Sequence, residues 1–185
     1  AASTHRPEEK IILDIYRDLI DKFNIRLLIA PRHPERIVEI KKLIALYDFK
    51  SVPLSSLSQK AYRREDIFVL DTVGSLFYFY SLADLCFVGG SLVNKGGHNI
   101  LEPLYFSKPT LFGPHMNNFK EIADIVVKYN AGIKVKDRED LRNRIVIFLE
   151  SKPLRDDVAA NCKKVFRCQK ELLDSNAEVV LRWAG

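Results

Sequence analysis

The sequence is poor in cysteine, in long apolar runs and in leader-like features. Its three cysteines, Cys86, Cys162 and Cys168, form no C-x-x-C pair, so neither a zinc site nor a disulfide framework is indicated. The longest apolar stretch, residues 76–92, is interrupted by Asp84 and a glycine pair, so nothing approaches the roughly 18–20 apolar residues that span a bilayer. The chain opens with AASTHRPEEK, which is polar and charged, so we expect no signal peptide. A membrane bundle is therefore excluded.

The composition is that of an ordinary globular domain. Apolar residues make up 47% and charged residues 29% of 185 residues, which predicts one soluble domain. A net charge of +5 suits an anionic partner, whether a nucleotide, a phospholipid surface or nucleic acid. We expect the densest basic residues to lie on solvated faces and nucleic acid not to be a partner. These residues are Lys60, Arg63, Arg64, Lys163, Lys164, Arg167 and Lys170.

Short apolar runs alternate with amphipathic helical patterns along the chain. Strands are predicted at residues 26–30, 51–53, 67–70, 85–88, 109–112 and 133–135. Helices are predicted at residues 7–23, 34–47, 76–82, 99–106, 119–129 and 137–149, and a C-terminal one at about 155–183. This alternation indicates a doubly wound, Rossmann-like α/β domain with a parallel sheet of about six strands. Residues 54–66 read as a polar loop, and residues 1–4 as the end of a further strand, so we expect a piece of a longer protein.

Ligands of such folds bind beyond the carboxyl ends of the strands, and the loop at residues 89–99 is the most informative there. It holds half of the chain's eight glycines and runs into a helix that Asn99 can cap. Backbone N–H groups near Gly96, Gly97 and His98, with the Lys95 side chain, suit a phosphate. The alternative is that the glycines only serve tight turns. Neither G-x-G-x-x-G nor a P-loop is present.

Three further strand ends carry polar residues. Arg32, held between two prolines, offers a planar fork for a phosphate or a base edge, or is a plain surface arginine. Glu102 either complements the helix dipole or accepts ribose hydroxyls, and Gly74 permits backbone contact with a base. Loop histidines 33, 98 and 115 lack a supporting metal motif, so we expect neither a metal nor a cofactor.

These strand-end strings resemble one known family. Residues 87–93 (FVGGSLV) followed by 96–103 (GGHNILEP) look like the signature of the 3-deoxy-D-manno-octulosonic acid (Kdo) transferases. PRHPER at 31–36, GPHMNNF at 113–119 and the opening AASTH are similar to its other motifs. The resemblance covers nearly the whole chain. It implies the C-terminal, donor-binding half of a GT-B glycosyltransferase that transfers Kdo from CMP-Kdo to the lipid A precursor at the cytoplasmic face of the Gram-negative inner membrane.

The resemblance also implies a set of CMP contacts. The matching positions in this chain are Pro31, Arg32, Val73, Gly74, Ser75, Asn99, Ile100, Leu101 and Glu102. Arg32 would meet the cytidine or phosphate region, Glu102 the ribose, and the helix end at Asn99 the phosphate. Lys95 and His98 could stabilise the leaving group. The family commonly has glutamate where this chain has Ser75, which leaves only backbone contact there.

The family's catalytic base and acceptor site lie in an N-terminal domain absent from this chain, so we expect no catalytic residue here and no turnover by the chain alone. The membrane contact of the family also belongs to the full-length protein. Two other readings remain open. One is half of a UDP-sugar transferase or an epimerase, and the other is a non-catalytic nucleotide-binding module.

Overall fold

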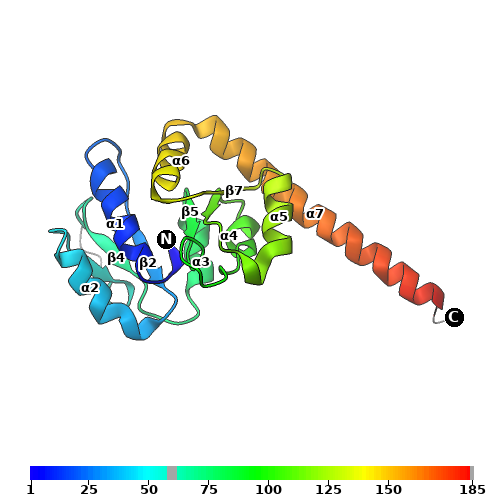
Figure 1. The fold of residues 1–185 in the computed structure, drawn as a ribbon, viewed down its shortest axis with the longest axis horizontal. Coiled ribbons are helices and arrows are strands. Elements are labelled where there is room, and N and C mark those ends of the chain that lie inside the picture. The colour runs from blue at the N-terminus through cyan, green and yellow to red at the C-terminus, as the bar shows by residue number, and fades with distance from the viewer. Residues whose placement is uncertain (58–61, 184–185) are drawn as a thin grey trace.

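The computed structural model describes residues 1–57 and 62–183, with side chains described as far as Arg167. Its centre is one parallel sheet of seven strands in the order β3-β4-β2-β1-β5-β6-β7 (Figure 1). The strands are β1 (Ala2–Thr4), β2 (Leu28–Pro31), β3 (Ser51–Pro53), β4 (Ile67–Val69), β5 (Cys86–Val88), β6 (Thr110–Phe112) and β7 (Gly132–Lys134). The doubly wound fold is therefore confirmed, with the opening residues as the additional strand.

The helices follow the predicted pattern with shifted ends. They are α1 (Glu8–Leu19), α2 (Ile37–Ala45), α3 (Leu76–Leu82), α4 (Leu101–Tyr105), α5 (Lys120–Lys128), α6 (Arg138–Glu150) and α7 (Lys152–Trp183), with 3-10 turns η1 (Pro34–Arg36), η2 (Leu54–Ser56) and η3 (Asn117–Phe119). The last helix starts earlier than predicted because Pro153 lies in its first turn, where a missing N–H breaks no bond. Of the predicted loop at 54–66, residues 58–61 lie outside the described part.

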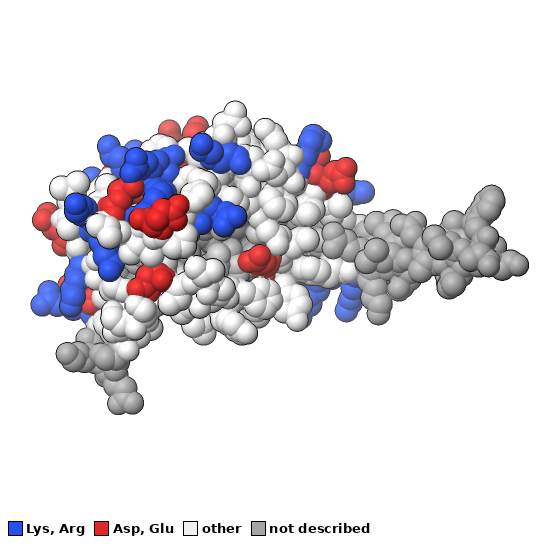
Figure 2. Space-filling model, turned by 90° about the horizontal axis from the view of Figure 1, so that it is seen from below, with Lys and Arg blue, Asp and Glu red and all other residues white. Residues whose placement is uncertain are grey.

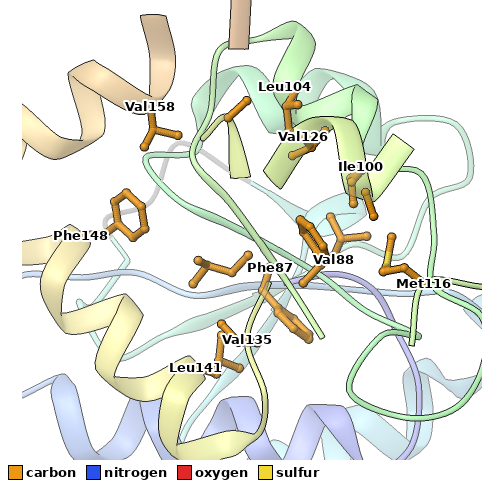
Figure 3. Packing of buried hydrophobic residues seen from close by; sticks show 14 of the residues in the cluster. Phe87, Val88, Ile100, Leu104, Met116, Val126, Val135, Leu141, Phe148 and Val158 are labelled. Atoms are coloured by element: carbon orange, nitrogen blue, oxygen red, sulfur yellow. The ribbon is translucent and has the colours of Figure 1, made fainter. Parts of the chain in front are cut away.

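Both faces of the sheet are covered. Adjacent residues of β5 point in opposite directions: Cys86 packs with Tyr80 of α3, and Phe87 belongs to the main core cluster. Figure 3 shows part of that cluster, in which Phe87 and Val88 lie among side chains of the α4, α5, α6 and α7 regions. On the other half of the sheet, α1 and α2 enclose Ile29 and Val69.

The chain reverses its winding direction at the middle of the sheet. From β1 the chain passes to β2, then to the edge strand β3, and returns to β4 between β2 and β3. From β4 it crosses to β5 on the other side of β1 and proceeds outward through β6 and β7. The loops that follow β1 and β5 therefore diverge to opposite sides. Such a switch point leaves a crevice at the carboxyl ends of the strands, where ligands of α/β proteins bind.

Helix α7 extends beyond the body of the domain (Figure 1). Its first half is part of the core, since Val158, Cys162 and Val165 are buried. None of the described helices is both long enough and apolar enough to cross a membrane.

Candidate functional site

A pocket of about 460 Å³ opens at the switch point, and we call it the strand-end pocket. Its lining residues come from strand β1 and from the loops and helix starts that follow β2, β4, β5 and β6: Ser3, Arg32, Gly74, Leu76, Phe77, His98, Asn99, Glu102 and Phe119. The structure thus brings together Arg32, Gly74, His98, Asn99 and Glu102, which the sequence named from three separate loops.

The other predicted contacts do not line this pocket. They are Pro31, Val73, Ser75, Lys95, Gly96, Gly97, Ile100 and Leu101. Val73 is 85% exposed and Ile100 fully buried, so Ile100 supports the pocket from the core. The Ser75 hydroxyl lies 3.0 Å from the Thr72 hydroxyl.

Sequence reasoning missed four lining residues: Ser3, Leu76, Phe77 and Phe119. Ser3 lies in a strand that carries no motif of its own, and the three apolar residues look like core positions in a helical pattern. Phe77 is 39% exposed, so the pocket has one apolar wall beside its charged residues. Aromatic and aliphatic walls of this kind suit a nucleobase.

The backbone at the first glycine pair of the loop, Gly89–Gly90, binds a carboxylate of the protein itself. The buried carboxylate of Glu8 accepts hydrogen bonds from four backbone N–H groups: those of His5 (2.9 Å), Gly90 (2.8 Å), Ser91 (3.1 Å) and Leu92 (3.0 Å). These N–H groups of the loop therefore already bind an anion, which is the protein's own Glu8 carboxylate. Burial raises the pKa of the Glu8 carboxyl, and the four N–H donors oppose that shift.

The second glycine pair is likewise engaged within the loop. The Gly97 N–H donates to Gly90 O at 2.9 Å, and Gly96 and Gly97 have φ of +83° and +74°. Glycine is the residue that adopts this left-handed conformation without strain. The Gly97 N–H is therefore used within the loop in this conformation, as the tight-turn alternative expects. The phosphate contact of Gly96, Gly97 and His98 stays a prediction.

Asn99 and Glu102 form a local pair at the start of α4. The Asn99 Oδ1 atom accepts from the Leu101 N–H at 3.0 Å, and its Nδ2 group donates to Glu102 Oε1 at 3.2 Å. Asn99 therefore accepts from the N–H of Leu101, the first residue of α4, and the helix begins two residues later than the sequence predicted. The same side chain holds the Glu102 carboxylate at the pocket wall. A carboxylate held in this way can accept hydrogen bonds from hydroxyl groups of a ligand.

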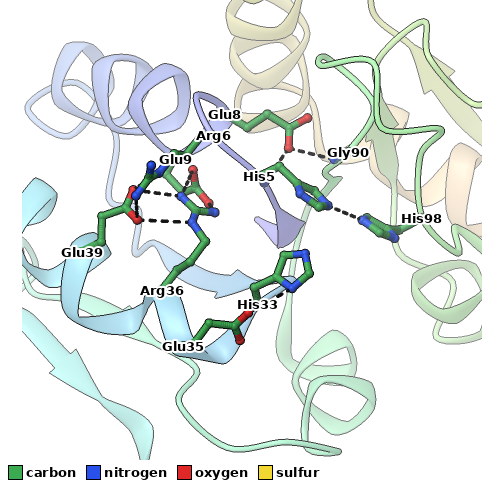
Figure 4. A network of polar contacts seen from close by, with 10 residues as sticks. All are labelled: His5, Arg6, Glu8, Glu9, His33, Glu35, Arg36, Glu39, Gly90 and His98. Carbon is green, nitrogen blue, oxygen red and sulfur yellow. Dashed lines mark hydrogen bonds and ion pairs between the residues drawn. The ribbon is translucent and has the colours of Figure 1, made fainter.

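Three histidines gather beside the pocket, two of them among the residues first considered for a metal. His5 Nε2 lies 2.8 Å from His98 Nε2, and the His5 and His33 ring centroids are 5.4 Å apart (Figure 4). Burial, with the charges of His5, Arg32 and His33, lowers the pKa of His98 to about 4. Among the described residues no group of histidine, cysteine, aspartate or glutamate is arranged to hold a metal ion.

A salt-bridge network fixes the loop that carries Arg32. Arg36 binds the buried Glu9 through two nitrogen–oxygen contacts of 2.8 and 3.2 Å, and also contacts Glu39, which pairs with Arg6 (Figure 4). Arg32 itself has no ion-pair partner within the described residues, although its N–H is bound to Thr4 O at 3.1 Å. The pocket thus presents a guanidinium that forms no ion pair with the described residues.

Of the other basic residues singled out in the sequence, those that the structure describes show no comparable arrangement. Arg63 and Arg64 each have a carboxylate within 3.9 Å, while Lys60 and the side chain of Lys170 lie outside the described part. On the face shown in Figure 2, Lys and Arg interleave with Asp and Glu. A larger cavity of about 870 Å³ lies among mostly apolar residues near the start of β1 and β5, including Ala1 and Leu85, and its lining contains none of the predicted contacts.

Known proteins resemble this chain over most of its length. No family model matches it. The 3-deoxy-D-manno-octulosonic acid transferase of Haemophilus influenzae is 39% identical over 84% of this chain, and that of Rickettsia prowazekii is 34% identical over 97%. The chain spans only 37% and 39% of these two proteins. The crystal structure of the C-terminal CMP-Kdo binding domain of WaaA from Acinetobacter baumannii superposes with a TM-score of 0.82 at 31% identity, covering 89% of this chain and 86% of that one.

The sheet topology and these relatives define the chain as a Rossmann-like domain of a GT-B glycosyltransferase. Within that class, the chain belongs to the 3-deoxy-D-manno-octulosonic acid transferase family and corresponds to its C-terminal domain. The resemblance of the strand-end strings is thereby confirmed.

Proposed function

We propose that this chain is the donor-binding domain of a Kdo transferase and that its strand-end pocket takes the CMP part of CMP-Kdo. The observation that carries the proposal is the convergence of Arg32, Gly74, His98, Asn99 and Glu102 on one pocket at the switch point. These residues came from motifs of the family, whereas the pocket comes from the geometry alone. The solved neighbour, a CMP-Kdo binding domain, shares the fold.

Each wall of the pocket suits one part of the nucleotide. The Glu102 carboxylate, oriented by Asn99, is placed to accept ribose hydroxyls. Phe77 and the backbone at Gly74 offer a flat, partly apolar surface to the base. Arg32 supplies the uncompensated positive charge that a phosphate requires, and its planar fork can bind two oxygens at once.

The leaving phosphate is stabilised by side chains in this proposal. Negative charge grows on the CMP phosphate as the sugar–phosphate bond lengthens, and fixed positive groups lower the barrier to that step. Because Glu8 occupies the N–H groups of Gly90, Ser91 and Leu92, the positive charge has to come from side chains, first of all from Arg32 in the pocket lining. The pKa of His98 is lowered to about 4, so its neutral imidazole can add a hydrogen bond rather than a charge. No step here calls on a metal.

The complete reaction belongs to a longer protein. In our proposal an N-terminal domain supplies the base that activates the acceptor, the lipid A precursor, and works at the cytoplasmic face of the inner membrane. The present chain binds the donor and holds the departing group in this proposal. It does not complete the transfer.

Calorimetric titration of the chain with CMP, UMP and AMP tests the donor assignment. We expect the tightest binding for CMP, and Arg32→Ala to weaken it about tenfold or more, the size expected for loss of a charge-assisted hydrogen bond. Arg63→Ala, whose side chain is 81% exposed, is the matched control. Tighter binding of UMP would instead favour a UDP-sugar enzyme, and equal binding of all three nucleotides a non-catalytic nucleotide-binding module.

A further inference from the structure

Ser3 lies in a β-bulge at the middle of the sheet. Ala2 is opposite Ala30 of β2, but Thr4 is opposite Pro31, so β1 advances two residues where β2 advances one. Ser3 is the extra residue, and its φ is +51°. Side chains otherwise alternate between the two faces of a strand, and a bulge changes the direction in which one of them points.

Backbone contacts hold the bulge from both sides. On one side the Gly89 N–H donates to Ala2 O at 2.7 Å, and on the other the Arg32 N–H donates to Thr4 O at 3.1 Å. The end of β5 also passes so close that a Cβ at Gly89 would lie 2.7 Å from Ser3 O. The segments after β2 and β5 therefore fix the position of Ser3.

A serine is an unfavourable residue for this backbone conformation. The left-handed region strains a residue that has a Cβ and does not strain glycine, so the bulge by itself needs no side chain at position 3. The Ser3 hydroxyl makes no hydrogen bond within the described part of the chain. Ser3 is partly exposed and lines the strand-end pocket. A strained residue with an unpartnered polar group in a pocket indicates a contact with a ligand.

The neighbours of Ser3 indicate which part of a ligand it meets. The strand order β2-β1-β5 places it between Arg32, which follows β2, and His98, which follows β5, and all three residues line the pocket. Of the lining residues, only Arg32 is a lysine or an arginine. Since the Arg32 N–H is bonded to the residue after Ser3, a group that Arg32 binds in the pocket lies next to Ser3.

We propose that Ser3 is a phosphate ligand of the donor nucleotide and that its hydroxyl donates a hydrogen bond to an oxygen of the phosphate that Arg32 binds. This inference rests on the proposed function. A hydroxyl supplies one O–H donor and no charge, so it adds to the Arg32 contact without a second cation. Because the bulge is already fixed, little conformational entropy is lost in placing this donor. The same bond strengthens as negative charge grows on the leaving phosphate.

The test compares CMP with cytidine, which lacks the phosphate, by NMR titration of the 185-residue chain. Ser3→Ala should weaken CMP binding about tenfold, the size expected for a hydrogen bond to a charged group, and leave cytidine binding unchanged. Ser3→Gly should lose the same CMP affinity, while its thermal midpoint rises by about 2–4 °C because glycine relieves the left-handed strain. Ser81→Ala, at an exposed serine of α3 outside the pocket lining, is the control and should keep both affinities.

Each other result has a distinct meaning. Failure of the wild-type chain to bind CMP would remove the proposed function itself. Wild-type CMP affinity in both Ser3 variants would overturn the phosphate contact and leave the proposed function intact. An equal loss for cytidine and CMP would show that Ser3 shapes the pocket without binding the phosphate, and would also overturn the inference. If Ser3→Ala fails to fold, Ser3→Gly decides the matter, because it removes the hydroxyl and the strain together.

Discussion

At the scale of single residues, the main lesson of the site concerns Glu8. In sequence it is one of two acids in a first helical turn, where the helix dipole favours negative charge. In the structure its carboxylate joins the loop after β1 to the loop after β5 through four N–H bonds. Those bonds fix the loop that carries His98, and they remove its amides from ligand binding.

Glu8→Gln should therefore destabilise the domain without removing a ligand contact. The amide keeps one acceptor oxygen and turns an NH2 group toward N–H donors, so at least two buried N–H groups lose their partner. We expect a loss of about 2–5 kcal/mol in the free energy of unfolding, measured by urea denaturation at pH 7. Glu121→Gln, on the exposed face of α5, is the control. A stability equal to that of the control would mean that Glu8 does not hold the loop.

At the scale of elements, hydrogen bonds and a close backbone approach join the loops after β5 and β6. Ser91 illustrates this, because its hydroxyl accepts from the Gly113 N–H at 2.8 Å and its carbonyl accepts from the His115 N–H at 2.9 Å. The loops after β5 and β6 thus behave as one body. Rigid positioning of this kind is what a preformed binding pocket needs.

Alanine substitutions at Gly113 and Gly74 can measure how much stability depends on the close approach of these loops. A Cβ at Gly113 would overlap backbone atoms of Ser91 and Leu92, whereas one at Gly74, whose φ is +84°, would meet nothing within 4 Å. We expect Gly113→Ala to cost about 2–3 kcal/mol by forcing the two loops apart, and Gly74→Ala about 1 kcal/mol of backbone strain. Thermal unfolding of both variants compares them, and the reverse order would contradict the packing described here.

At the scale of the whole molecule, our proposal assigns the donor side of a reaction to this domain and the rest to another part of a longer protein. The chain spans under two fifths of the transferases that it matches. A departing phosphate can be stabilised here, but no group in the pocket is assigned to deprotonate an acceptor. In our proposal, the complete reaction therefore needs a second domain besides this one.

A chimaera tests this division of labour. The chain alone should show no Kdo transfer from CMP-Kdo to a lipid A precursor, while its fusion to the N-terminal half of the Haemophilus influenzae relative should restore turnover. The same fusion with Arg32→Ala should be at least tenfold slower, because it loses charge at the leaving group. Transfer by the isolated chain would show that it holds a base of its own.

The sequence by itself determined the class of fold and the loops that matter. Alternating apolar runs and helical patterns specify a parallel sheet because hydrophobic periodicity is a local property that neighbouring residues encode. The strand ends at Arg32, Gly74 and residues 98–102 could be placed at one edge of the sheet from topology alone. That much follows without any coordinate.

Only the tertiary structure decided which groups meet across that edge. Glu8 and Gly90 are 82 residues apart, and His5 and His98 are 93 apart, so neither contact leaves a periodic trace in the sequence. Whether the amides of a glycine loop bind a ligand or the protein's own carboxylate depends on which side chain the fold places next to the loop. Long-range packing settles that question, and here it gave the amides to Glu8 and left the strand-end pocket to its side chains.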